Sequence, residues 1–68
     1  MAVVHVGVEE ARETEVLALI CRGMSNLEIA DHLFVSVNSV KTYVRQIYQK
    51  IGVARRAQAV AWGLAHGF

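Results

Sequence analysis

The stretch from residue 36 to residue 51 repeats apolar side chains at steps of three, four, three and four residues. An α-helix turns by about 100° per residue, so this spacing gathers the apolar side chains on one face. The apolar positions are Val37, Val40, Val44, Ile47 and Ile51. We therefore predict a helix over residues 37–51, with Ser36 as its N-cap and Gly52 at its end.

The opposite face of this helix carries hydrogen-bond donors and positive charge, and it has no carboxylate. Its polar residues are Asn38, Lys41, Thr42, Arg45 and Gln49. A helix of this width fits the major groove of DNA. The working hypothesis is that this helix reads DNA.

Two helices are predicted before it. The first, over residues 10–22, begins among glutamates, which the helix dipole favours there, and stops at Gly23. The second is short and opens at Ser25, which forms a capping box with Glu28. The expected inward residues are Val16, Leu17, Ile20 and Cys21 in the first helix and Leu27, Ile29, Ala30 and Leu33 in the second. The short connection to the next helix predicts a helix-turn-helix.

A fourth helix is predicted over residues 56–66. Its core-facing stripe is expected to be Ala57, Val60, Ala61 and Leu64. Trp62 and Ala59 then point the other way, and an exposed tryptophan is typical of an interface, so we expect a dimer contact there. The alternative is that Trp62 folds down over the end of the first helix or over the N-terminal arm.

The predicted fold is all-α, a four-helix bundle that contains a helix-turn-helix. The chain has 68 residues, enough for one domain, which we expect over residues 9–68 after a linker end or N-terminal arm over residues 1–8. A domain of this size buries only about 60 % of its unfolded surface, so a partner chain or domain would help to stabilise it.

The charges divide sharply along the chain. Before residue 35 there are six acids and two bases, whereas the rest holds five bases and no acid. Such asymmetry is typical of proteins that bind a polyanion through one basic face. The alternative is a solvated helix that happens to be basic.

Several functional classes find no support in the sequence. No apolar run reaches the roughly 18 residues of a membrane span, and the N-terminus lacks the basic flank of a secretory signal. The single cysteine, Cys21, rules out an internal disulfide and suits the reducing cytoplasm. His5, His32 and His66 are too scattered for a metal site. No phosphate loop or activated nucleophile is present, so we expect neither a cofactor nor an enzyme.

Short motifs in one register run through residues 12–60. They are RE and EVL within 12–17, GMSN and EIA within 23–30, LFVS at 33–36, SVKT at 39–42, KIGV at 50–53 and RAQAV at 56–60. This series resembles the LuxR/FixJ-type (GerE-like) DNA-binding domains of bacterial transcription regulators. Three departures stand out: Glu9-Glu10-Ala11 replaces the usual Leu-Thr-Pro start, Tyr43 replaces a histidine, and Arg55 replaces a capping Ser or Asn.

The resemblance implies a helix-turn-helix whose second helix, residues 37–51, sits in the major groove. It implies a homodimer, often formed through the last helix. It also implies an N-terminal receiver or ligand-sensing domain that this chain lacks, and RNA polymerase as a further partner to consider.

The same resemblance assigns base reading to Lys41, Thr42 and Arg45. Arg and Lys donate to guanine O6 and N7, and a threonine methyl contacts a thymine methyl. The expected contacts to the DNA backbone are Asn26, Asn38, Ser39, Tyr43, Lys50, Arg55 and Arg56. Lys50 could equally be plain surface, Asn26 could have a purely local role, and Tyr43 could pack at the core edge.

The function expected from these features is sequence-specific binding of double-stranded DNA by the effector domain of a bacterial transcription regulator. One alternative is a protein-interaction module that uses the same fold and its last helix as the working surface. Another is a domain like region 4 of a sigma factor, which shares the helix-turn-helix but fits the RAQAV segment less well.

Overall fold

A computed structural model describes the backbone of residues 8–68 and the side chains of residues 11–68. It contains four helices, α1 (Val8–Cys21), α2 (Asn26–Leu33), α3 (Val37–Ile51) and α4 (Arg56–Ala65), and no strand within these residues. The all-α prediction is therefore confirmed. The predicted N-terminal arm lies outside the described residues except for Val8, which already belongs to α1.

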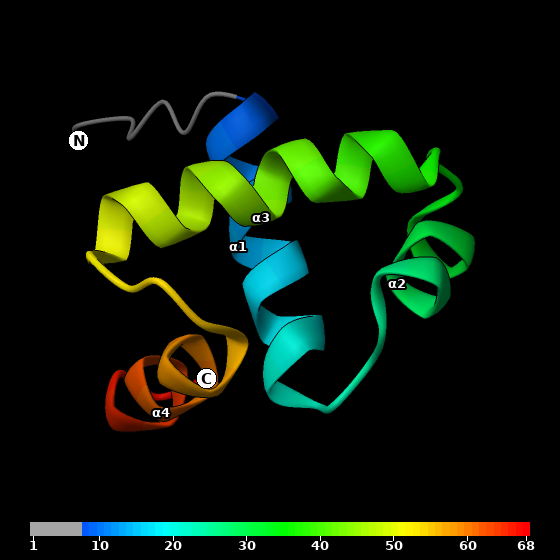
Figure 1. Cartoon of the computed structure of the whole chain (residues 1–68). Coiled ribbons are helices and arrows are strands. Elements are labelled where there is room, and N and C mark those ends of the chain that lie inside the picture. The colour runs from blue at the N-terminus through cyan, green and yellow to red at the C-terminus, as the bar shows by residue number, and fades with distance from the viewer. Residues whose placement is uncertain (1–7) are drawn as a thin grey trace, which may run out of the picture.

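The first helix occupies the middle of the molecule. It crosses behind α3, with α2 and α4 on opposite sides of it (Figure 1). It packs against all three of the other helices, whereas α2 packs mainly against α3. The largest fully buried side chains come from three helices: Val16 and Ile20 of α1, Ile29 of α2 and Val40 of α3. One small core thus holds α2 and α3 in a fixed relation.

The predicted apolar face of α3 is confirmed. Val40, Val44 and Ile47 are buried, and Val37 and Ile51 at the two ends are half-buried against the same core. The spacing of three and four residues was sufficient to predict the buried face of α3, because this helix has one apolar face and one polar face.

The predicted caps of α2 and α3 are also present. The Ser25 hydroxyl accepts a hydrogen bond from the Glu28 amide at 3.2 Å, and the Glu28 carboxylate accepts one from the Ser25 amide at 2.9 Å. The Ser36 hydroxyl accepts from the Ser39 amide at 3.1 Å. These side chains satisfy amides that have no partner within their helix, and so determine where α2 and α3 begin.

The end of α2 differs from the usual pattern. Its C-cap is Phe34, which has the left-handed φ of 57° that glycine or asparagine normally supplies. The Phe34 side chain is 94 % exposed. Leu27, predicted to face inward from the same helix, is 61 % exposed, so that prediction is wrong.

The predicted orientation of α4 is wrong. Ala59, expected on the outer face, is completely buried, and Gly63 one turn later is buried as well. Leu64, expected in the core, is 63 % exposed. Trp62 is half-buried against the core and stacks on His66, with ring centroids 3.8 Å apart. Trp62 lines a pocket with Glu13, Thr14 and Leu17, which lie within α1 rather than at its end. This position agrees with the alternative that Trp62 folds down over the first helix only in part, and the N-terminal arm of that alternative lies outside the described residues. Nearly every residue of α4 is apolar or small, so its periodicity did not determine which face is inward.

Candidate nucleic-acid interface

The three residues predicted to read bases lie together on the exposed face of α3. Lys41 and Arg45 are one helical turn apart, and neither makes a hydrogen bond or ion pair within the part of the chain that the structure describes. The Thr42 hydroxyl donates to the carbonyl of Asn38 at 3.1 Å, which leaves its methyl group available for an apolar contact. The face therefore offers two unpaired cations with one methyl group beside them.

The N-terminus of α3 holds the next two predicted contacts. Asn38 is exposed, whereas Ser39 is half-buried and its hydroxyl lies 2.9 Å from that of Ser36. The amide donors of this first turn point along the helix axis, where anions are favoured. Asn38 is thus open to a phosphate, while the Ser39 side chain is already engaged in the cap.

Tyr43 packs against the hydrophobic core and is half-buried. This position agrees with the core-edge role considered for it. Its role as a hydrogen-bond donor to phosphate stays a prediction.

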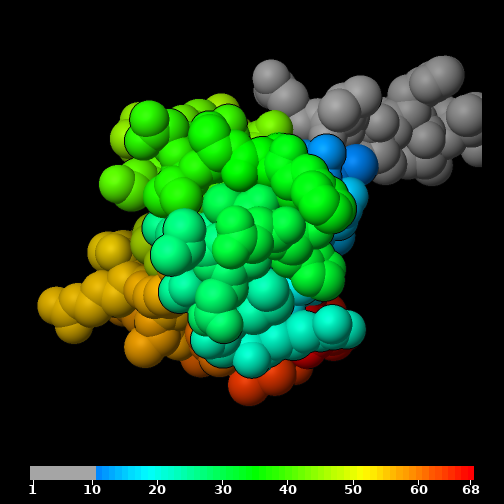
Figure 2. All heavy atoms as spheres, turned by 90° about the vertical axis from the view of Figure 1, so that its right-hand side faces the viewer, coloured from blue at the N-terminus to red at the C-terminus, as the bar shows by residue number. Residues whose placement is uncertain are grey.

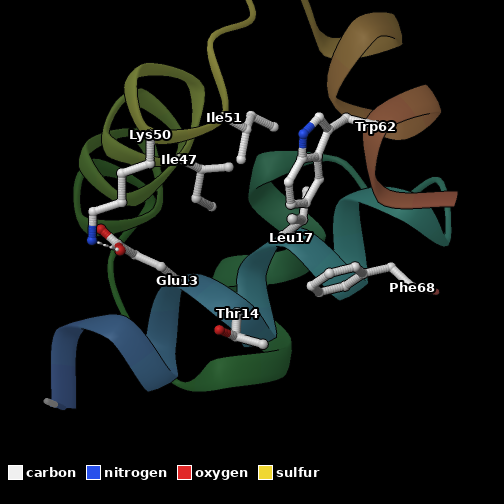
Figure 3. Close-up of a pocket in the computed structure, with 8 residues that line it drawn as sticks. All are labelled: Glu13, Thr14, Leu17, Ile47, Lys50, Ile51, Trp62 and Phe68. Carbon is white, nitrogen blue, oxygen red and sulfur yellow. Dashed lines mark hydrogen bonds and ion pairs between the residues drawn. The ribbon is translucent and has the colours of Figure 1, made fainter. Parts of the chain in front are cut away.

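Lys50 has an acid partner that lies far away in the sequence. Its ammonium group is 2.6 Å from the carboxylate of Glu13 on α1, and the two residues are 37 positions apart (Figure 3). Glu13 is only 6 % exposed, which makes it the single buried charged residue among the described side chains. The sequence pattern did not predict this burial. The role of Lys50 as a phosphate contact stays a prediction.

Asn26 and Arg56, both predicted to contact phosphate, bind each other. One nitrogen of the Arg56 guanidinium donates to the side-chain oxygen of Asn26 at 2.8 Å, and the other donates to the carbonyl of Met24 at 2.5 Å. This fork joins the start of α4 to the turn before α2. The structure thus gives Asn26 a local role as well, which was the alternative considered for it.

Arg55, the neighbour of Arg56, behaves differently. It is exposed at the N-cap position of α4 and makes no side-chain cap hydrogen bond. The carboxamide oxygen of Gln58 caps the helix instead, accepting from the amides of Ala54 at 2.9 Å and Arg55 at 3.0 Å. The N-cap position thus lacks the side-chain acceptor that a Ser or Asn would supply, and Gln58 binds the two amides that precede α4.

The basic elements share one side of the molecule. In Figure 2 the segment leading into α4 (gold) projects on the same side as the edge of α3 (yellow-green). The stretch from α3 to the start of α4 holds five bases and no acid, whereas the described acids all lie on α1 and α2. The described acids and these five bases therefore lie on different helices, although Glu13 of α1 pairs with Lys50 of α3.

No group of three or more metal-binding side chains occurs within the described residues. None of the four helices described is both long and apolar enough to cross a membrane.

Comparisons with known proteins give a consistent result. Residues 11–62 match a family described as bacterial regulatory proteins, luxR family. The HTH-type transcriptional regulator MalT of Yersinia pestis (strain Pestoides F) is 51% identical over 49 residues, as is MalT of Serratia proteamaculans (strain 568). Each match covers 72% of this chain but only 5% of the relative's length.

A solved structure has a similar fold. It is that of the response regulator ChrA in a haem-sensing two-component system, with a TM-score of 0.79 and 35% identity. The match covers 91% of this chain and 31% of ChrA.

Proposed function

The chain belongs to the luxR family of bacterial regulatory proteins, whose domains bind DNA in transcription regulation, and on that premise we propose that it reads the sequence of duplex DNA with α3 in the major groove. The observation that carries the proposal is the pair Lys41 and Arg45, exposed one turn apart on α3 and without an acid partner. Unpaired cations on a helix that fits the groove supply both attraction to phosphate and donors for guanine.

Lys41, Thr42 and Arg45 make the base contacts in this proposal. Asn38 and Arg55 contact the DNA backbone at the two ends of the basic side. Five further residues stay candidate backbone contacts: Asn26, Ser39, Tyr43, Lys50 and Arg56. A side chain with an internal partner must give up part of that bond to reach a phosphate, so we rank these below Asn38 and Arg55.

We place the proposed dimer contact on the outward face of α4 instead of at Ala59. Ala57, Ala61 and Leu64 follow one another at steps of four and three residues, and all are exposed. Small residues with one leucine allow two copies of α4 to approach closely. Trp62 belongs at the edge of such an interface, while Ala59 is inside the fold and has no part in it.

The relatives are much longer than this chain, so its working context is also a proposal. A receiver or ligand-sensing domain preceding the DNA-binding domain fits the response-regulator neighbour. The proposed setting is the bacterial cytoplasm, with RNA polymerase as a further partner.

The test begins with selection of bound sequences from a random DNA pool at a stated salt concentration. Lys41→Ala and Arg45→Ala are then compared on the selected sequence, with Arg22→Ala as the control because Arg22 is an exposed cation at the far end of α1. We expect each α3 variant to cost about 1–3 kcal/mol and the control to cost little. Unchanged affinity in both α3 variants would overturn the proposal.

The salt response separates this function from the alternative of a protein-interaction module. Binding through phosphate contacts weakens steeply as salt rises, whereas an apolar interface responds little. The dimer is tested with Leu64→Glu, which should leave the fold intact but abolish cooperative binding to paired half-sites. Equal cooperativity in that variant would place the dimer contact elsewhere.

A further inference from the structure

One polar side chain on α3 has an atom that the fold leaves without a partner. The carboxamide oxygen of Gln46 is buried, yet it accepts no hydrogen bond from the described residues. A buried acceptor without a partner is rare in folded proteins, because the free energy spent in removing it from water is not recovered. No hydrogen bond to this oxygen therefore holds the carboxamide in its inward position.

The residues one turn before and one turn after Gln46 do have partners. The Thr42 hydroxyl donates to the carbonyl of Asn38. The Lys50 ammonium group binds the buried carboxylate of Glu13 on α1 (Figure 3). Residues four apart lie on the same side of a helix, so Thr42, Gln46 and Lys50 form a row along α3. This row runs from a predicted base contact at Thr42 to the contact with α1 at Lys50, and Gln46 lies between the two.

The neighbours of Gln46 bring it close to the DNA that α3 is proposed to read. Gln46 follows Arg45 directly and lies one turn after Thr42, and both of these residues are exposed. Gln46 itself is half-buried, so rotation about its side-chain bonds carries the carboxamide outward, toward the exposed face.

The chemistry of a carboxamide determines which group on DNA it fits. It presents an acceptor and a donor side by side, and the edge of adenine in the major groove presents the complementary pair, the N6 amino group and the N7 acceptor. Guanine in the major groove and phosphate offer only acceptors, so neither gives the oxygen of Gln46 a partner. Adenine satisfies both ends of the carboxamide at once.

We propose that Gln46 is a further specificity-determining residue, whose carboxamide turns outward when α3 enters the major groove and binds the N6 and N7 edge of an adenine. This inference rests on the proposed function, because α3 must first lie in the groove. The turn breaks no hydrogen bond to the oxygen, and it gives that oxygen a donor. It also adds a preference for adenine, which the predicted contacts of Lys41, Thr42 and Arg45 with guanine and thymine do not supply.

The first measurement is the stability of Gln46→Met, which keeps the length of the side chain and has no polar atom to leave unpaired. We expect its midpoint of urea unfolding to equal or exceed that of the wild type. Gln49→Met makes the same change at an exposed position of α3 and is the matched control. A clear loss of stability in Gln46→Met relative to Gln49→Met would mean that the fold binds the carboxamide, and the inference would be overturned.

The second measurement uses the selected DNA sequence with each adenine replaced in turn by 7-deazaadenine, which lacks the N7 acceptor. We expect replacement of at least one adenine to weaken wild-type binding about threefold or more. Gln46→Met should bind the unmodified DNA about tenfold more weakly than the wild type, and should bind the modified DNA no more weakly still. Gln49→Met should respond to the modified adenine as the wild type does.

Lys41→Ala and Arg45→Ala on the unmodified DNA separate this inference from the proposed function. If neither variant binds more weakly, the proposed function fails. If they bind more weakly but no modified adenine affects the wild type, or if Gln46→Met keeps the wild-type response, only the role of Gln46 is overturned. A response that disappears in Gln49→Met instead would assign the adenine to Gln49 and would overturn it as well.

Discussion

The sulfur of Cys21 on α1 occupies the space that a side chain at residue 63 of α4 would need. A Cβ added to Gly63 would overlap this sulfur atom, so the two helices approach each other as closely as glycine permits. The Cys21 thiol also lies 4.0 Å from the carbonyl of Val60, within the same contact. Gly63 is therefore retained inside a helix for packing, although glycine costs about 1 kcal/mol there relative to alanine.

Gly63→Ala is expected to destabilise the fold by about 1–3 kcal/mol, because the overlap with Cys21 outweighs the gain in helix propensity. Urea unfolding followed by circular dichroism measures the change. In the background of Cys21→Ala the same substitution should be neutral or stabilising. Equal destabilisation in both backgrounds would show that the contact with the sulfur is not responsible.

Lys50→Met tests whether Lys50 serves the fold or the DNA. Removal of the ammonium group leaves the buried Glu13 carboxylate without its 2.6 Å partner, and we expect a loss of about 1–3 kcal/mol in the free energy of unfolding. The slope of DNA affinity against salt concentration should stay the same, because a lysine held by Glu13 releases no counterion on binding. A salt slope smaller by the equivalent of about one phosphate contact would show that Lys50 leaves Glu13 to bind a phosphate.

Arg55 and Arg56 form a matched pair with opposite expected effects. Arg56→Ala removes the fork to Asn26 and Met24 and should cost about 1–3 kcal/mol of stability. Arg55→Ala should leave stability unchanged and reduce the salt slope of DNA binding by about one contact. Thermal unfolding and binding at several salt concentrations, on the same two proteins, measure both effects. If Arg56→Ala unfolds at the same temperature as the wild type, the fork to Asn26 and Met24 does not stabilise the fold.

The capping box of α2 predicts a pH dependence. Hydrogen bonds from the Ser25 amide and, less strongly, its hydroxyl hold the pKa of the Glu28 carboxyl below its ordinary value. Because the folded pKa is the lower one, the stabilisation is fully present above the unfolded value of about 4.3. It is lost as pH falls from there through the folded pKa.

Glu28→Gln should therefore be less stable than the wild type near neutral pH, with the difference shrinking in acid. Unfolding free energies measured from pH 7 down through the acid range would follow this convergence. A constant difference across that range would mean that the charge of Glu28 contributes nothing.

The sequence by itself determined the family, the number and type of the helices, the caps at Ser25 and Ser36, and the inward face of α3. The family match over residues 11–62 confirms the resemblance that the motifs predicted. These features are local: a cap depends on residues three apart, and the face of α3 on one sharply amphipathic pattern. The positions of Lys41, Thr42 and Arg45 on the exposed face followed from the same pattern, although their contacts with bases stay a prediction.

Only the tertiary structure decided which way α4 faces and which cations are paired. The sequence of α4 is apolar or small on nearly every side, so its orientation depends on the close fit of Gly63 against Cys21 rather than on periodicity. Lys50 and Arg56 find partners 37 and 30 residues away, separations at which sequence pattern carries no information. The fold thus separates cations that hold the helices together from Lys41, Arg45 and Arg55, which stay available for DNA.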